Sequence, residues 1–323
     1  MKDNWERHEK YYPLGLDQIS RVIESVFKNS KVDSFNLLGT GFRNSNYMIF
    51  LEDFSEPLVL RLYKGGKDTA GKEMSISRLV RKTVPTADYI HVDTSSRLLD
   101  IPWAILEWKP GTALSELMKI GDSSDIASYA NPVGRTLAEI HKYKFSEHGF
   151  LGPSLEVVTP FRLDETHFLQ LTGKFLNERC GEFLGHTIRD SLWKFCIKNS
   201  YALMENEEEP ALVHSDYNGL NILIEGDTPD VSVSAVLDWE FAFSGSRYAD
   251  IGNLLRYEEE GSAFERHFIK GYREGGCFLD PNWRMLAKLQ DLVALCDLLN
   301  RSTTEAPRRV EDIRSLITRT LTE

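Results

Sequence analysis

Residues 211–241, ALVHSDYNGLNILIEGDTPDVSVSAVLDWEF, contain the pattern on which the interpretation of this chain depends. Two apolar, β-prone runs occur in this stretch. The sequence GDTPD at residues 226–230 separates them, and it consists of residues that turns prefer. We therefore expect two adjacent strands joined by a turn, with polar residues gathered at the strand ends.

Three of these polar residues have a spacing that suggests chemistry. Asp216 is followed five residues later by Asn221, and Asp238 comes at the end of the next strand. Phosphoryl transfer to an alcohol requires a group that receives the hydroxyl proton and oxygen ligands for Mg²⁺ beside the phosphates. An Asp or Asn beside a glycine is by itself ordinary turn chemistry, so the prediction depends on the complete spacing.

The same residues carry a family resemblance. The pattern H-x-D-x-x-x-x-N from His214 to Asn221, followed by Asp238-Trp239, resembles the aminoglycoside phosphotransferase and choline kinase family, which shares its fold with the protein kinases. The resemblance implies that Asp216 is the catalytic base and that Asn221 and Asp238 are metal ligands. It also implies that His214 supports the catalytic loop.

The rest of the chain fits this resemblance from about residue 33 to about residue 300. β-prone runs dominate up to residue 108, and helical periodicity dominates afterwards. We therefore predict an α+β fold of the two-lobed, protein-kinase-like type. Its small β-rich N-lobe, residues 1–108, is expected to bind nucleotide, and its larger helical C-lobe, residues 109–323, to hold the catalytic and acceptor-binding residues.

The periodicity also predicts individual elements. The expected helices and strands before the C-lobe are a helix over 17–28, a hairpin over 35–53, a strand over 57–63, a helix over 70–82, and strands over 89–93 and 103–108. Further helices are expected over 133–143, 168–184, 192–208 and 283–300.

Two charged residues upstream occupy positions where the family binds phosphate. Arg61, in the strand 57–63, stands where the family has Lys or Arg for the α- and β-phosphates, and Glu73 stands where the next helix supplies its ion-pair partner. The alternatives are that this pair is only structural or that Lys64 contacts the phosphates instead. A guanidinium is a planar fork, so it would hold phosphate in a different geometry from an ammonium group.

Two backbone segments complete the expected nucleotide site. The turn containing Gly39, Gly41 and Asn44 is predicted to bring N–H groups over the phosphates, as glycine-rich turns do. The segment ILEWKPG at 105–111 resembles the family's hinge, and backbone atoms of Glu107 and Lys109 are predicted to pair with adenine. A plain β-bend is the competing interpretation of this segment.

Charge limits the partners of the protein. Residues 1–110 carry 16 Lys and Arg against 15 Asp and Glu, whereas residues 111–323 carry 22 against 34, so the second part has a net charge of −12. Nucleic acids and anionic membranes require basic patches, so we expect neither as a partner. The acidic part either attracts a cationic acceptor or only keeps the surface soluble. The run Glu258, Glu259 and Glu260 is either a solvated surface or part of an acceptor cleft.

Other patterns narrow the function. Only 11 residues separate Asp238 from Asp250, and no activation segment lies between them, so we do not expect a peptide substrate. The four cysteines are far apart and are expected to be buried thiols. The charged start of the chain and the lack of a long apolar stretch favour a cytoplasmic protein.

The sequence therefore predicts a kinase that uses ATP or GTP with Mg²⁺ and phosphorylates a hydroxyl group of a small molecule. Among acceptors, an aminoglycoside-like polycation is ranked first because of the acidic C-lobe. Two alternatives remain open: a metabolic kinase acting on choline, a sugar, homoserine or a macrolide, and a nucleotide-binding pseudokinase. The sequence gives no oligomeric state.

Overall fold

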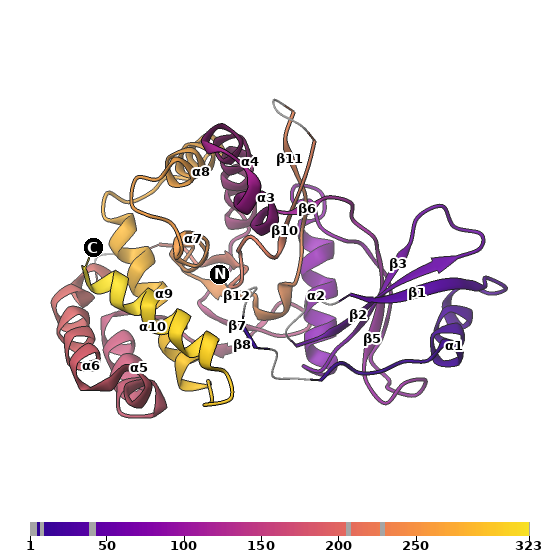
Figure 1. Ribbon diagram of the computed structural model, residues 1–323, viewed down its shortest axis with the longest axis horizontal. Coiled ribbons are helices and arrows are strands. Elements are labelled where there is room, and N and C mark those ends of the chain that lie inside the picture. Colours follow the sequence, from indigo (N-terminus) through magenta and orange to yellow (C-terminus); the bar gives the residue numbers. More distant parts are fainter. Residues whose placement is uncertain (1–4, 7–9, 39–42, 205–207, 227–229, 323) are drawn as a thin grey trace.

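The computed structural model describes residues 5–6, 10–38, 43–204, 208–226 and 230–322. A β-sheet lies at one end of the molecule and most helices lie at the other (Figure 1). Helix α2 (Lys67–Val80) stands between these two parts, which we call the sheet region and the helical region. The predicted α+β fold class is confirmed, and the boundary at residue 108 stays a prediction.

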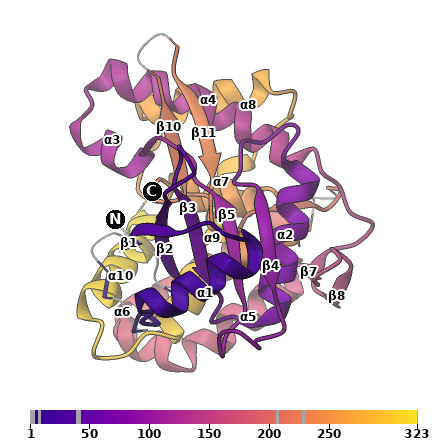
Figure 2. The same cartoon turned by 90° about the vertical axis from the view of Figure 1, so that its right-hand side faces the viewer.

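The sheet region contains five antiparallel strands in the order β1-β2-β3-β5-β4. Every second side chain of β2 is buried, as expected for a strand with one face on a core. Helix α1 (Leu16–Val26) lies against the sheet and buries Ile19, Val22 and Ile23 in the same core (Figure 2). The strands are β1 (Val32–Leu38), β2 (Ser45–Leu51), β3 (Leu58–Leu62), β4 (Tyr89–Asp93) and β5 (Trp103–Glu107).

Helix α2 packs on both parts of the molecule. Ala70 contributes to a small core with the sheet, whereas Ile76 and Val80 join the large core of the helical region. The helix is displaced from the predicted range 70–82, since it begins at Lys67 and ends at Val80. Because Glu73 lies between these two sets of contacts, α2 places its carboxylate at the junction of the two regions.

The chain crosses between the regions through a tightly packed joint. After β5 it passes Gly111 and forms β6 (Thr112–Ala113), which pairs with β10 (Ile222–Glu225). Gly111 has φ +130°, and a Cβ there would lie 2.5 Å from the Ser234 hydroxyl oxygen. This position therefore requires glycine. The crossing between the two regions is thus fixed against β10, the strand that directly follows residues 214–221.

The helical region has one large hydrophobic core. Its β-strands form two small sheets, in the orders β11-β10-β6 and β8-β7-β12-β9. Among the described residues, no helix is long and apolar enough to cross a membrane. Its elements after β6 are α3 (Leu114–Ile120), α4 (Ser123–His141), β7 (Gly149–Leu151), β8 (Val157–Pro160), α5 (Glu165–Leu176), α6 (Arg179–Asn199), β9 (Ala211–Val213), β10, β11 (Ser232–Val236), β12 (Phe243–Gly245), α7 (Tyr248–Leu255), α8 (Ala263–Glu274), α9 (Trp283–Asn300) and α10 (Pro307–Thr322).

Several predicted elements differ from the structure. The predicted helix over 168–184 is wrong as a single helix, because α5 ends at Leu176 and α6 begins at Arg179. The helical run 192–208 is helical only to Asn199, after which a 3₁₀ turn follows. The expected hairpin is formed by β10 and β11, but β9 pairs with β12 instead. The segment between β9 and β10 is a loop, and this loop carries the predicted catalytic residues.

Candidate active site

The loop from His214 to Asn221, called the catalytic loop below, is held at its start by a buried aspartate. Asp250, on α7, accepts hydrogen bonds from the backbone N–H groups of His214 (2.8 Å) and Ser215 (2.7 Å). Ser215 has φ +70°, a left-handed conformation that costs energy for a residue other than glycine. The two oxygens of Asp250 therefore stabilise a strained turn just before Asp216.

A second buried layer orients Asp250. The Nε2 atom of His141 lies 3.1 Å from Asp250 Oδ2, and its Nδ1 atom lies 2.8 Å from the Tyr272 hydroxyl. Burial lowers the pKa of His141, which favours a neutral ring that donates to Asp250 and accepts from Tyr272. Sequence reasoning did not include His141 and Tyr272 in the site, since an isolated buried His or Tyr has no distinctive pattern.

His214 ties the catalytic loop to the next strand end. Its Nδ1 accepts from the N–H of Asp216 at 3.2 Å, and its Nε2 lies 3.0 Å from the carbonyl oxygen of Leu237. This pattern assigns the ring proton to Nε2. His214 thus connects the two polar strand ends, which agrees with the supporting role that the resemblance implies.

The carboxylate of Asp216 is oriented by two amide groups. Asn218 donates to Oδ1 at 2.9 Å and Asn221 donates to Oδ2 at 3.0 Å. Both asparagines also donate to the backbone carbonyl of Asp216. Donors to both oxygens fix the direction of the carboxylate, which a general base requires.

Asn221 and Asp238 lie beside each other at adjacent strand ends. The pair Ile222 and Val236 are register partners, and one position further the Leu237 N–H donates to the Asn221 carbonyl at 2.8 Å. Asp238 has φ +68°, a second strained position in the site. The side-chain nitrogen of Asn221 is used on Asp216, which leaves the amide oxygen as the atom suited to a cation.

These oxygens fit a magnesium site that is completed by a substrate. In the described part of the chain, no three His, Cys, Asp or Glu side chains form a metal cluster. Mg²⁺ in phosphoryl-transfer sites is commonly held by one or two protein carboxylates together with substrate phosphates and water. A carboxylate and a carboxamide on neighbouring strand ends match that kind of site.

Arg61 links the sheet region to Asp238. Its Nη2 lies 2.8 Å from Glu73 Oε1 and 2.5 Å from Asp238 Oδ1. The hydroxyl groups of Tyr63 and Tyr89 donate to the other Glu73 oxygen at 3.0 and 2.6 Å. Burial alone would lower the pKa of Arg61, but Glu73 and Asp238 raise it above its ordinary value. The structure thus brings the predicted Arg61 and Glu73 together and adds Asp238 as a third partner.

Glu240 adds a further carboxyl group to this cluster. Its side chain is buried, and burial together with the nearby Asp238 raises its pKa to about 8. Arg43 Nη1 lies 3.7 Å from its Oε2. Glu240 is therefore mainly protonated at neutral pH and titrates beside the predicted metal ligand. The Asp-Trp-Glu sequence was visible, but only the structure shows that its third residue is buried here.

The other expected nucleotide residues are placed as follows. Gly39 and Gly41 lie outside the described residues. Asn44 is buried just before β2, and its Oδ1 accepts from the Lys64 N–H at 3.3 Å. The Lys64 ammonium group donates to the backbone carbonyl of Lys10. This contact directs Lys64 toward the N-terminal segment, whereas Arg61 contacts the carboxylate of Asp238, the predicted metal ligand.

The predicted hinge lies at the end of β5. The Glu107 N–H donates to the carbonyl oxygen of Asp88 at 3.0 Å, and the Lys109 ammonium lies 3.0 Å from Glu107 Oε1. Because the Glu107 N–H already has a partner, its carbonyl is the better candidate for an adenine amino group. The assignment of Glu107 and Lys109 to adenine stays a prediction.

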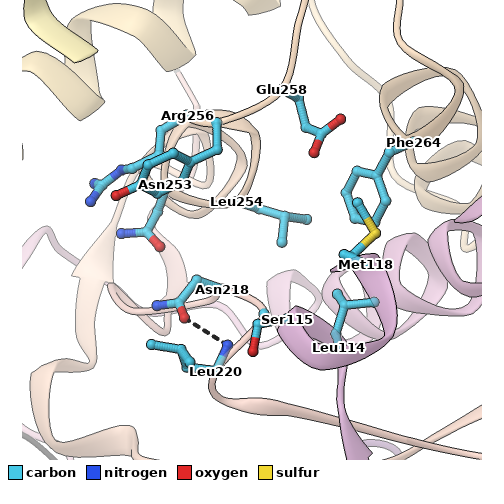
Figure 3. Close-up of a pocket in the computed structure, with 12 residues that line it drawn as sticks. Leu114, Ser115, Met118, Asn218, Leu220, Asn253, Leu254, Arg256, Glu258 and Phe264 are labelled. Atoms are coloured by element: carbon cyan, nitrogen blue, oxygen red, sulfur yellow. Dashed lines mark hydrogen bonds between the residues drawn. The ribbon is translucent and has the colours of Figure 1, made fainter. Parts of the chain in front are cut away.

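A pocket of about 550 Å³, open to solvent, lies beside the catalytic loop. Figure 3 shows Leu114, Ser115 and Met118 of α3 on one side, Asn218 and Leu220 of the loop below, and Leu254 and Glu258 above, together with Asn253, Arg256 and Phe264. Gly219 allows α3 to approach the loop, since a Cβ there would lie 2.9 Å from the Ser115 backbone nitrogen. The pocket begins one hydrogen bond from Asp216, through Asn218.

Comparison with known proteins agrees with this geometry. The fold is that of the protein-kinase-like small-molecule kinases, and residues 34–289 match the model of the phosphotransferase enzyme family. The chain therefore belongs to the phosphotransferase enzyme family. The resemblance and the protein-kinase-like fold predicted from the sequence are both confirmed. A search among curated proteins gave no match.

Solved structures show the same fold at low sequence identity. Aminoglycoside phosphotransferase APH(4)-Ia is 15% identical, with a TM-score of 0.70 and coverage of 95% of this chain and 99% of that one. APH(2")-IIia, solved with GDP and kanamycin, is 17% identical, with a TM-score of 0.70 and coverage of 94% and 98%. A protein from Thermobifida fusca assigned as a fructosamine-3-kinase is 17% identical, with a TM-score of 0.61 and coverage of 94% and 100%.

Proposed function

We propose that this protein transfers the γ-phosphate of ATP or GTP to a hydroxyl group of a small molecule. The observation that carries the proposal is the arrangement of Asp216, whose oxygens are fixed by Asn218 and Asn221. Asp216 lies on the catalytic loop, and Asp238, the partner of Arg61, lies just after strand β11. A proton acceptor, oxygen ligands and a phosphate-binding cation thus occur in one site, as phosphoryl transfer requires.

In the proposed reaction Asp216 orients the acceptor hydroxyl and receives its proton. The hydroxyl oxygen forms a bond to the γ-phosphorus, while the bond from that phosphorus to the bridging oxygen breaks and the nucleoside diphosphate leaves. Because the carboxylate is already oriented by two amide donors, little reorganisation is needed when the acceptor binds. Asp250 and His141 act behind it as positioning residues.

Asn221 and Asp238 are proposed to hold Mg²⁺, and the fit rests on their oxygen-bearing side chains and their positions at adjacent strand ends. When bound, this ion neutralises charge on the phosphate oxygens. Asp238 Oδ1 is paired with Arg61, so Arg61 shares its charge between the metal ligand and Glu73. Arg61 is therefore well placed to turn toward a phosphate without losing both carboxylate partners.

The nucleotide is proposed to lie between the sheet region and the catalytic loop. Arg61 and Glu73 would serve the phosphates, with the turn of Gly39, Gly41 and Asn44, and Glu107 and Lys109 would serve the adenine through their backbone. Complexes of APH(4)-Ia with ADP or AMP-PNP and of APH(2")-IIia with GDP support nucleotide use by this fold. Because both adenine and guanine nucleotides occur in these complexes, ATP and GTP are equal candidates for this protein.

The test is nucleoside-diphosphate release, measured with a coupled assay in Mg²⁺ and either ATP or GTP over a panel of acceptors. The panel contains kanamycin, choline, homoserine, a hexose and a macrolide. Acceptor-dependent release that disappears in Asp216→Asn supports the kinase. A protein that binds nucleotide but releases no diphosphate with any acceptor or with water would instead be the pseudokinase.

The acceptor is proposed to be cationic, and an aminoglycoside-like polycation is one class. The net charge of −12 over residues 111–323 favours it, and hygromycin B and kanamycin are bound by two of the similar structures. For a polycationic acceptor, kcat/KM should fall with ionic strength several times more steeply than the affinity for nucleotide. Salt screens the carboxylates of the protein, since the Debye length falls from about 10 Å at 0.1 M to about 3 Å at 1 M.

A further inference from the structure

The N-terminal segment of the chain contacts both parts of the molecule. Residues 5–6 contact α10 in the helical region, and residues 10–14 contact β2 in the sheet region (Figure 1). We call these residues together the N-terminal strap. Trp5 belongs to the large core of the helical region, whereas Leu14 belongs to the core of the sheet region. One short segment thus buries an apolar side chain in each of two separate cores.

Trp5 anchors the strap on α10. Only 9% of the residue is exposed, and its Nε1–H donates to Asp312 Oδ2 at 2.8 Å. The guanidinium group of Arg309 lies over its ring, 5.3 Å from the ring centre. Asp312 also accepts from the Tyr257 hydroxyl at 2.5 Å, and Tyr257 lines the pocket beside the catalytic loop. The strap is therefore fixed to a helix that also supports the wall of this pocket.

Glu6 adds a second contact with the same helix. Its Oε1 and Oε2 atoms accept from the backbone N–H groups of Arg308 at 3.0 Å and Arg309 at 3.2 Å. Both groups belong to the first turn of α10, where backbone N–H groups have no partner within the helix. A carboxylate at this end of a helix is also favoured by the helix dipole. The strap thus caps the helix on which it lies.

Two side chains of β2 hold the other part of the strap by its backbone. The Tyr47 hydroxyl accepts from the N–H of Leu14 at 3.0 Å and donates to the carbonyl oxygen of Tyr12 at 2.6 Å. The Ser45 hydroxyl oxygen accepts from the N–H of Tyr12 at 2.9 Å. Because Tyr47 and Ser45 are themselves buried, these hydrogen bonds form a defined anchor in the sheet region.

The anchor on β2 lies beside the cation that contacts the helical region. Ser45 and Tyr47 are on either side of Asn46, and Asn46 is the register partner of Arg61 on β3. Arg61 in turn contacts Asp238 in the helical region. The strap and the contact between Arg61 and Asp238 therefore join the same two regions, one through the chain and the other through an ion pair.

The covalent link between the two anchors is short. Only residues 7–9 separate Glu6 from Lys10 in the sequence. A chain extends by at most about 3.6 Å per residue, so the Cα atoms of Glu6 and Lys10 cannot be more than about 14 Å apart. While both anchors are in place, this length limits how far the two regions can separate.

We infer that the N-terminal strap limits the separation of the sheet region from the helical region and thereby strengthens the binding of nucleotide between them. The part that concerns nucleotide rests on the proposed function. If the two regions spend less time in the arrangement that binds nucleotide, the apparent affinity falls by the same factor. The strap keeps that arrangement populated before nucleotide arrives.

A lengthened strap tests the inference, because it keeps every residue of both anchors. Nine Gly and Ser residues inserted after Glu6 would raise the limit on the distance from Glu6 to Lys10 to about 47 Å. The matched control has the same insertion after Ser55. This residue is exposed between β2 and β3, so the added length there lies within the sheet region alone.

The separation of the two regions is measured with spin labels in the full-length chain. Glu24→Cys on α1 and Lys194→Cys on α6 place the labels at exposed positions in the two regions (Figure 1). Cys277→Ser removes the native thiol that is not buried. In double electron–electron resonance without nucleotide, the lengthened strap should give a broader distribution with longer distances. The control insertion should give the same distribution as the parent protein.

Nucleotide affinity gives the second readout. In isothermal titration with AMP-PNP and Mg²⁺, the lengthened strap should bind about three- to tenfold more weakly than the wild type. The control insertion should change affinity by less than about twofold. Distances that are the same in the two insertion variants, or equal affinities of these variants for AMP-PNP, would overturn the inference.

A double-mutant cycle separates the tether from simple support of α10. Glu6→Ala should weaken AMP-PNP binding by about two- to threefold, because it loosens the anchor. In the lengthened strap the same substitution should cause no further loss, since the anchors are no longer coupled. Glu311→Ala, at an exposed position of the same helix, should leave affinity unchanged. An equal loss from Glu6→Ala in both backgrounds would contradict the inference.

The distance measurement does not require catalysis, so it distinguishes this inference from the proposed function. Longer distances in the lengthened strap of a protein that releases no diphosphate with any acceptor would support the strap and contradict the kinase. Diphosphate release by a protein whose distances do not respond to the insertion would support the kinase and contradict the strap.

Discussion

Asp216 and Asp238, the two carboxylates assigned to chemistry, are held in different ways. The oxygens of Asp216 accept hydrogen bonds from Asn218 and Asn221, only two and five residues further along the chain. Asp238 instead pairs with Arg61, which is 177 residues away and belongs to the sheet region. The proposed proton acceptor is thus positioned locally, and the proposed metal ligand depends on the contact between two parts of the molecule.

This difference has a functional consequence. The orientation of Asp216 is complete once the catalytic loop is formed, so it should be the same with and without nucleotide. The environment of Asp238 changes whenever Arg61 changes partner. We therefore expect catalysis to depend on the fixed group and nucleotide binding to depend on the adjustable one.

Replacing Asp216 should give the largest effect. Asp216→Asn keeps the shape of the side chain but cannot receive the hydroxyl proton, so kcat should fall on the order of 10²-fold or more. Nucleotide affinity should stay within about twofold, because the change does not touch Arg61 or Asp238. Diphosphate release and isothermal titration measure the two quantities. A variant that keeps more than about a tenth of the wild-type kcat would show that Asp216 is not the base.

The local arrangement itself should depend on Asp250. Asp250→Ala leaves the buried N–H groups of His214 and Ser215 without their acceptors, so the free energy of unfolding should fall by about 2–5 kcal/mol. Urea unfolding measures this loss. The control is Asp190→Ala, since Asp190 is exposed and its loss should change stability by less than about 0.5 kcal/mol. Equal stability of the two variants would mean that Asp250 does not hold the loop.

Removing the cross-region contact should mainly affect the nucleotide. Arg61→Met leaves Glu73 and Asp238 without their shared cation, and the KM for nucleotide should rise by about tenfold or more. Arg61→Lys should fall between this variant and the wild type, since an ammonium is a point charge rather than a fork. Lys64→Met is the matched control and should have a nearly normal KM. A larger effect at Lys64 than at Arg61 would reverse the assignment.

The smallest expected effect concerns Glu240. Because its pKa is raised to about 8 by burial and by Asp238, increasing the pH from 7 to 9 should ionise it. The new negative charge should weaken nucleotide binding in EDTA by about two- to fivefold, an energy of about 0.4–1 kcal/mol. Glu240→Gln should not show this loss. Comparing the two proteins at each pH also removes the effect of ionisation of the nucleotide itself, since that effect is the same for both. Identical pH profiles for the two proteins would remove Glu240 from the site.

The sequence was sufficient for the local part of this arrangement. The spacing from His214 to Asn221 and the following strand brought Asp216, Asn221 and Asp238 into one site, because adjacent strand ends lie together whatever the rest of the fold does. The pairing of Arg61 with Glu73 followed from the family resemblance. The strands of the sheet region were predicted nearly at their observed positions, because β-prone residues and the turns between them are visible locally in the sequence.

What the sequence did not reveal depends on contacts between distant residues. The link from Tyr272 through His141 to Asp250 joins three helices, and the sequence does not show that these three residues meet. The acidic C-lobe suggested a polycationic acceptor, but net charge alone does not show which carboxylates face a pocket. Glu258 could be separated from Glu259 only by their positions in three dimensions.

The central claim is that Asp238 holds the metal ion of a bound nucleotide. The most direct test is isothermal titration of ATP into wild type and Asp238→Ala, each in excess Mg²⁺ and in EDTA. The wild type should bind at least about tenfold more tightly with Mg²⁺, and Asp238→Ala should show no such difference. Equal affinity of the wild type in Mg²⁺ and in EDTA, or a metal effect that persists in Asp238→Ala, would contradict the account.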